Sequence, residues 1–188
     1  MSSFDSELHE IHPKTPAGWR SWLQKNHTTS DGVWLIYYRA STGNRRLSWE
    51  EAVREALCCG WIDSKAKSID DERYKQTFTP RKPKSVWSKI NKQHIAELTE
   101  LGLMSDVGLR AVDVAKKNGA WTFLEPLDAL IVPADLESAL QWSDSARDAY
   151  EALSNSAKRA VLYPLYSAKR EETRAKRLAD VLVALEDE

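Results

Sequence analysis

The chain has 188 residues, a mass of 21.4 kDa and a net charge of −1, which is enough chain to bury a core without disulfides or metals. Its 42% hydrophobic and 29% charged residues are typical of a soluble globular protein. No apolar run approaches the roughly 18–20 residues of a membrane span, and the first residues lack the basic and apolar segments of a secretory signal. We therefore expect a cytoplasmic protein without a membrane span.

Charge and tryptophan are both distributed unevenly. Residues 1–94 carry a net charge of +5 and residues 95–188 a net charge of −6, and the basic excess lies in 65–92, where nine Lys and Arg face three acids. Six of the eight Trp lie in the first 87 residues. Because indole rings supply both core packing and ligand stacking, this predicts an aromatic core, an aromatic-lined cleft, or both, beside a patch that attracts anions.

The first half of the chain alternates helical and strand patterns. Thr15-Pro16 is a helix start, and the box Ser48-x-x-Glu51 starts a second helix that Gly60 ends. Between and after these helices the apolar and alternating runs predict strands, the last two forming a hairpin. The predicted helices are 16–26 and 48–59, and the predicted strands are 33–39, 61–69 and 74–79.

The second half is helical. A stiff basic loop, 80–84, leads to a helix capped by Ser85 or Ser88, and residues 126–133 are typical of a linker. Pro164 is expected to kink or break one of the later helices. The predicted fold class is α+β: a small antiparallel or mixed sheet packed by helices in residues 1–125, followed by an all-helical C-terminal module in residues 126–188.

Three separated blocks carry a resemblance to a known family. They are Ala52 to Asp63 (AVREALCCGWID), Thr79 to Asn91 (TPRKPKSVWSKIN) and Ser167 to Leu178 (SAKREETRAKRL). On these blocks the chain resembles the YdeI/OmpD-associated family, also called bacteriocin-protection or OmdA, over nearly its whole length. Cys59 stands where that pattern has an aromatic residue.

The resemblance implies an α+β N-terminal region and a helical C-terminal region. It also implies a link to resistance against antimicrobial peptides or bacteriocins. The resemblance implies no catalytic residues, no cofactor and no metal, so we expect none of these from it.

A candidate ligand cleft is predicted around the hairpin and the helix that follows it. Arg81 can bind a carboxylate or phosphate with its fork of donors, Ser85 and Ser88 lie near a helix N-terminus that favours anions, and indole faces can stack on a planar group. The alternative is that the Trp are core, Arg81 pairs with Asp63, and the serines are caps. The candidate binding residues are Trp34, Trp61, Asp63, Lys65, Arg81, Ser85, Trp87, Ser88 and Asn91.

Cysteine and metal chemistry are weaker candidates. Cys58 and Cys59 are adjacent, so they close no loop as a disulfide, and they end a helix whose dipole opposes a thiolate. Buried, inert thiols are the favoured interpretation. The four His and the two Cys lack metal-ligand spacing, so no metal site is expected. The four histidines are His9, His12, His27 and His94.

Three functions remain open at this point. The first is a cytoplasmic protein that binds a small anionic or planar ligand or a protein partner. The second is an enzyme acting on such a substrate through Asp63, Arg81 and Ser88, and the third is a nucleic-acid accessory protein using the basic segment 65–92. Nucleic acid is disfavoured by the pI near 6.5. The face formed by Arg170, Arg174 and Arg177 is interpreted as solvated and salt-bridged.

Overall fold

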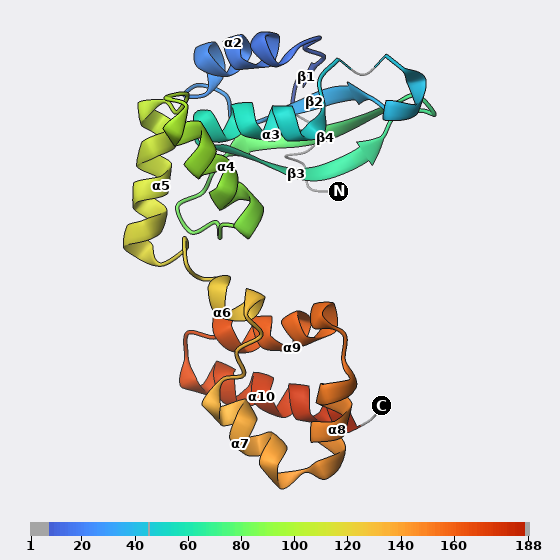
Figure 1. The fold of residues 1–188 in the computed structure, drawn as a ribbon, viewed down its shortest axis with the longest axis vertical. Helices are drawn as coiled ribbons and strands as arrows, with labels where there is room; N and C mark the ends of the chain where they lie inside the picture. Colours follow the sequence, from blue (N-terminus) through green and yellow to red (C-terminus); the bar gives the residue numbers. More distant parts are fainter. Residues whose placement is uncertain (1–7, 45, 187–188) are drawn as a thin grey trace. The chain divides into compact units, whose positions relative to one another are not determined.

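A computed structural model describes residues 8–44 and 46–186. The chain divides into two compact units, one ending at Thr122 and one beginning at Phe123 (Figure 1). The first unit contains a four-stranded mixed sheet with helices, and the second contains only helices within the residues described. This confirms the predicted α+β class.

The sheet has the strand order β1-β2-β4-β3. Its middle strands, β2 (Val33–Tyr38) and β4 (Arg73–Pro80), are antiparallel, and β3 (Trp61–Ser68) is antiparallel to β4. The strands β2, β3 and β4 confirm the three strands predicted from the sequence. The outer strand β1 (Glu10–Ile11) runs parallel to β2 and was missed, because two residues give no alternation to recognise.

One face of the sheet holds the core of the first unit. Side chains alternate along β2, so Leu35 and Tyr37 join the buried cluster with α2 and α3, whereas Trp34 lies on the opposite face. In Figure 1, α3 lies over the sheet, and α2 lies above α3 at the top of the view. The helices of this unit are α2 (Pro16–Asn26), the 3-10 turn η1 (Ala40–Thr42), α3 (Trp49–Cys58), α4 (Lys89–Glu100) and α5 (Asp106–Asn118).

The helix boundaries follow the signals in the sequence. Thr15 accepts a hydrogen bond from the Gly18 N–H, and Ser48 and Glu51 form the predicted capping box. Gly60 has φ +72°, the left-handed conformation that ends α3. Ser88, rather than Ser85, caps α4 through the Asn91 N–H.

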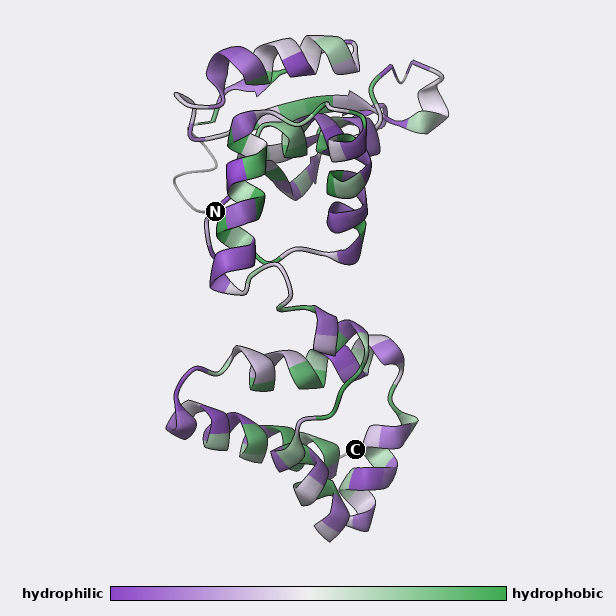
Figure 2. Ribbon diagram, turned by 60° about the vertical axis from the view of Figure 1, so that its left-hand side comes forward, coloured by the Kyte–Doolittle hydropathy of each residue, from purple (hydrophilic) through white to green (hydrophobic). Residues whose placement is uncertain are grey.

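The second unit packs its helices around a separate apolar core that includes Leu136, Leu162 and Leu165. Figure 2 shows that its helices carry both hydrophilic and hydrophobic stretches, as amphipathic helices do. They are α6 (Glu125–Asp128), α7 (Ala134–Trp142), α8 (Asp144–Ala152), α9 (Asn155–Ser167) and α10 (Glu171–Glu186).

Two expectations for this unit need correction. The predicted linker 126–133 begins inside α6, because Pro126 occupies a first-turn position where its missing N–H is not needed. Of the two outcomes expected at Pro164, the break is wrong, because α9 continues to Ser167, and the kink stays a prediction. Pro164 lies in the last turn of α9, and its carbonyl accepts hydrogen bonds from the Arg177 guanidinium of α10, at 2.7 Å, and from the Ser167 hydroxyl of α9, at 3.2 Å.

Candidate functional site

Arg81 and Trp87 form a stacked pair in the loop between β4 and α4. The backbone fixes both ends of this loop, because the Arg81 N–H donates to the Gly60 carbonyl at 2.9 Å and the Trp87 N–H donates to Ala120 at 3.3 Å. The guanidinium carbon of Arg81 lies 3.7 Å from the centre of the Trp87 ring. This is a close cation–π contact.

Both side chains keep a buried donor without an acceptor. Arg81 Nη1 donates to the Val86 carbonyl at 3.0 Å, but Arg81 Nε and Trp87 Nε1 are buried and have no partner. Burial lowers the pKa of Arg81 to about 10, and the more distant charge of Asp63 offsets part of this shift. The side chain therefore remains charged at neutral pH. No carboxylate of the described residues forms an ion pair with it, which is unusual for a half-buried cation.

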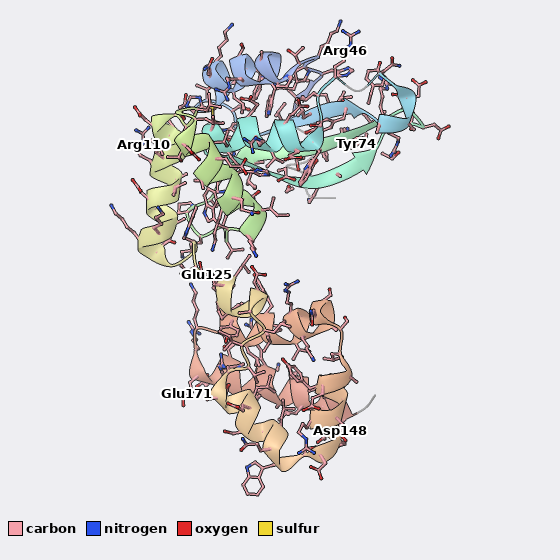
Figure 3. The ribbon with its side chains drawn as sticks, in the orientation of Figure 1. Arg46, Tyr74, Arg110, Glu125, Asp148 and Glu171 are labelled. Carbon is pink, nitrogen blue, oxygen red and sulfur yellow. The ribbon has the colours of Figure 1, made fainter. Side chains whose placement is uncertain are left out.

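A recess of about 180 Å³ opens beside this pair. Arg110, labelled in Figure 3, brings a second guanidinium to it from α5. None of the described residues that line the recess is acidic, so these side chains give it an electrostatic potential that favours an anion. The lining residues are Arg81, Lys82, Pro83, Trp87, Arg110, Ala111 and Val114.

Trp34 and Trp61 do not line this recess. Trp61 is 1% exposed, donates its indole N–H to the His27 carbonyl at 3.2 Å and packs edge-on against Trp22. Trp34 lies on the other face of the sheet, beneath the ammonium groups of Lys67 and Lys75 at 5.1 and 4.8 Å from its ring centre. These two indoles are packing elements of the sheet.

Asp63 is also engaged elsewhere. Its Oδ2 accepts hydrogen bonds from the Trp49 indole at 3.0 Å and from the Gln76 amide at 2.6 Å. The Arg81–Asp63 ion pair of the alternative interpretation is therefore not formed. Lys65 is exposed at the β-bulge of β3, where its N–H donates to the Thr77 hydroxyl.

The polar residues of the loop serve mainly the backbone. The Ser85 N–H donates to the Lys82 carbonyl at 2.9 Å, and the Ser88 hydroxyl accepts the Asn91 N–H at 3.2 Å. Among the predicted binding residues, the structure therefore brings Arg81 and Trp87 together at one recess and leaves the other seven outside its lining.

Sequence reasoning missed Lys82 and Arg110 as site residues. Lys82 was noted only as part of a basic loop. Arg110 is exposed on α5; the hydrophobic pattern predicts this helix but does not predict how it lies against the loop 81–87. Trp121 was missed as well, although its ring contacts that of Trp87, with centres 5.1 Å apart. No local signal in the sequence links 81–87 to 110 or 121.

The two cysteines are free and buried, as expected. Burial raises the pKa of Cys58 to about 11, although the nearby Arg20 guanidinium, 3.7 Å from the sulfur, opposes the shift. We expect neither thiol of the native protein to react with a disulfide reagent at pH 7.5, and both to react once denaturant unfolds the first unit. A thiol titration with and without guanidinium measures this. Fast labelling of one cysteine in the native state would instead identify a reactive thiol.

The basic hairpin is partly neutralised by its own contacts. Lys67 and Lys75 lie over Trp34, and the Lys75 ammonium also pairs with Glu10. In the described part of the chain, no group of three or more His, Cys, Asp or Glu is arranged to hold a metal ion. Nor is any helix within residues 8–44 and 46–186 both long and apolar enough to cross a bilayer.

The arginine face of α10 is structural rather than free. Arg174 binds Asp135 of α7 with two hydrogen bonds, at 2.6 and 2.7 Å, and donates to the Leu165 carbonyl at 2.7 Å. Arg177 donates to the Pro164 carbonyl and to the Ser167 hydroxyl. The face is therefore salt-bridged, as expected, but two of its arginines bind α7 and α9 and are not simply solvated.

The fold and the recess define an α+β protein that carries a cationic, aromatic recess and a separate helical unit. Residues 11–111 match a family described as a domain of unknown function (DUF8412), and because this match covers more than half of the 188 residues, the chain belongs to that family. Residues 129–188 match the family described as bacteriocin-protection, YdeI or OmpD-associated (OmdA). No curated protein and no solved structure matches the chain.

These matches confirm the predicted family resemblance and refine its extent. The third block, Ser167 to Leu178, lies inside the OmdA match, whereas the other two blocks lie inside the DUF8412 match. Arg81 and Trp87 therefore belong to the domain of unknown function, and the bacteriocin-protection description belongs to the helical unit.

Proposed function

We propose that this protein binds a small anionic ligand, or the anionic group of a partner, in the recess beside Arg81 and Trp87. The observation that carries the proposal is the pair of buried, unpartnered donors on two stacked side chains, Arg81 Nε and Trp87 Nε1. A buried donor without an acceptor costs about 1–3 kcal/mol. A carboxylate or phosphate oxygen in the recess would accept from such donors and neutralise the guanidinium charge.

The size and lining of the recess restrict the ligand. A volume of about 180 Å³ is below the roughly 300–1,000 Å³ of pockets that enclose a drug-sized molecule. It fits a compact anion or a single anionic group. Lys82 and Arg110 add positive charge at its lining, so a group with two negative charges is favoured over one with a single charge.

A binding role is better supported than the enzymatic alternative. That alternative needs Asp63 and Ser88 near Arg81, but Asp63 accepts from Trp49 and Gln76, and Ser88 caps α4. Neither residue lines the recess. The association with bacteriocin or antimicrobial-peptide resistance and the cytoplasmic address remain part of the proposal. The free thiols of Cys58 and Cys59 are compatible with a reducing compartment.

The variant Arg81→Gln tests the proposed site. We expect wild-type protein to bind inorganic phosphate or glutarate in calorimetry, and Arg81→Gln to weaken that binding at least tenfold, which corresponds to about 1.4 kcal/mol. The reason is that glutamine keeps much of the length of the side chain but loses the charge and the Nε donor.

Lys84→Gln is the matched control, because Lys84 is exposed in the same loop, does not line the recess and changes the charge equally. It should retain wild-type affinity for both probes. Equal losses of affinity in the two variants would show that only the net charge of the protein matters. Full affinity in Arg81→Gln would show that the anion does not bind in this recess.

A further inference from the structure

A second cavity lies at the open edge of β2. Strand β1 pairs with β2 at Trp34 and Leu35, and within residues 8–44 and 46–186 no other strand pairs with the rest of this edge of β2. The chain after Ile11 and the loop before α3 enclose a cavity of about 440 Å³ there. Its lining residues are His12, Pro13, Lys14, Ile36, Tyr37, Tyr38, Asn44, Arg46 and Leu47.

The cavity is rich in hydrogen-bond donors, and none of the described residues that line it carries a carboxylate. Lys14 and Arg46, the latter labelled in Figure 3, are exposed members of its lining, and neither forms an ion pair with a described residue. Asn44 adds a side-chain amide. Donors and positive charge without matching acceptors are the features of an anion site rather than of a cation site.

Tyr37 supplies a buried hydroxyl that has no partner. Its side chain is 2% exposed, and its ring is stacked on that of Tyr74 with centres 4.9 Å apart. The hydroxyl is buried and makes no hydrogen bond. Burial raises the pKa of Tyr37, reinforced by Tyr74 and Asp63, so the group stays protonated and can donate. A phenylalanine would pack the same core without this unsatisfied group.

His12 also lines this cavity. Its ring contacts that of Tyr38, with centres 5.2 Å apart. Burial lowers the pKa of His12, and the positive charges of Arg73 and Lys14 lower it further. Desolvation and these two positive charges thus both disfavour the protonated ring of His12.

We propose that this cavity is a second binding site, for a small organic anion whose carboxylate or phosphate is bound by Lys14 and Arg46 and which accepts a hydrogen bond from Tyr37. Its volume lies within the range of pockets that enclose a small organic molecule, unlike the recess beside Arg81. Tyr38 and Ile36 provide wall area for an apolar or planar body. The site shares no lining residue with that recess and does not depend on it.

Phenyl phosphate is the probe for this site, with phenol as the neutral comparison. Calorimetry in an Arg81→Gln background measures this cavity separately from the recess. We expect one site for phenyl phosphate, no measurable binding of phenol, and at least a tenfold loss of affinity in Arg46→Gln and in Lys14→Gln. Lys25→Gln, at the far end of α2, removes the same charge outside the cavity and should bind as before.

Tyr37→Phe separates binding from folding. Without ligand, this variant should melt at the same temperature as the parent or higher, because it removes an unsatisfied hydroxyl. Its affinity for phenyl phosphate should nevertheless fall about fivefold or more. Unchanged affinity in Tyr37→Phe and Arg46→Gln, or equal binding of phenol and phenyl phosphate, would overturn the proposal.

Discussion

Replacing Gly108 by alanine is expected to destabilise the first unit by about 3 kcal/mol, at the upper end of the usual cost of overpacking. A Cβ at this position would lie 2.3 Å from the carbonyl oxygen of Cys58 and 2.9 Å from Met104 Cε. Neither helix can easily retreat, because the N–H and the hydroxyl of Ser105 both donate to that same carbonyl, at 3.0 and 2.6 Å. Urea unfolding followed by circular dichroism measures the loss.

Gly18→Ala provides a matched control. Gly18 and Gly108 occupy the same position of their helices, and each donates its N–H to the capping hydroxyl, of Thr15 and Ser105 respectively. A Cβ on Gly18 would meet only ordinary contacts, the nearest at 3.4 Å. It should leave stability unchanged or raise it by up to about 1 kcal/mol, because alanine is the better helix former. Similar losses in both variants would contradict the close contact between α3 and α5.

Removing the charge of Arg174 is expected to cost the helical unit about 2 kcal/mol, between the values for exposed and for buried ion pairs. The two side chains of the Arg174–Asp135 pair are 28% and 35% exposed, and the guanidinium also satisfies the Leu165 carbonyl. Arg174→Met keeps the aliphatic packing and tests the polar contacts alone. Hydrogen exchange of the amides in α7 and α10 reports the stability of this unit directly.

The same pair predicts a pH dependence. Hydrogen bonds from Arg174 hold the pKa of Asp135 below its usual value, so the folded state binds the proton less well than the unfolded state. The contribution is therefore complete above the ordinary carboxyl pKa and is lost as the pH falls through the lowered one. The stability difference between wild type and Asp135→Asn should shrink towards pH 2 in denaturant titrations. A constant difference from pH 7 to pH 2 would show that the ion pair contributes nothing.

Elements with local signals were predictable from the sequence. The capping box of Ser48 and Glu51 and the left-handed Gly60 each satisfy backbone groups of their own helix, so a few neighbouring residues determine the structure. The strand β1 was not predictable, because only pairing with β2 makes two residues extended. The continuation of α9 past Pro164 to Ser167 was also not predicted, because proline in a helix removes a hydrogen bond to the carbonyl four residues earlier.

The candidate site was predictable only where its residues are close in the chain. Arg81 and Trp87 are joined by a short, proline-containing loop, and their contact follows from that closeness. The burial of Trp61 and the hydrogen bonds of Asp63 depend on how the strands pair with one another and how α3 packs on them. The composition of the chain does not specify either. Arg110 reaches the recess from α5, and its position requires the tertiary fold.

The most direct test of the proposed function is a nitrogen–proton NMR titration with inorganic phosphate. It follows the Nε–H signals of Arg81 and Trp87, with the Trp61 indole as an internal reference, because Trp61 already donates to the His27 carbonyl. We predict that the signals of Arg81 and Trp87 move together with one midpoint while that of Trp61 stays in place. Stationary signals from Arg81 and Trp87 at saturating phosphate, or equal shifts of all indoles, would contradict an anion site in this recess.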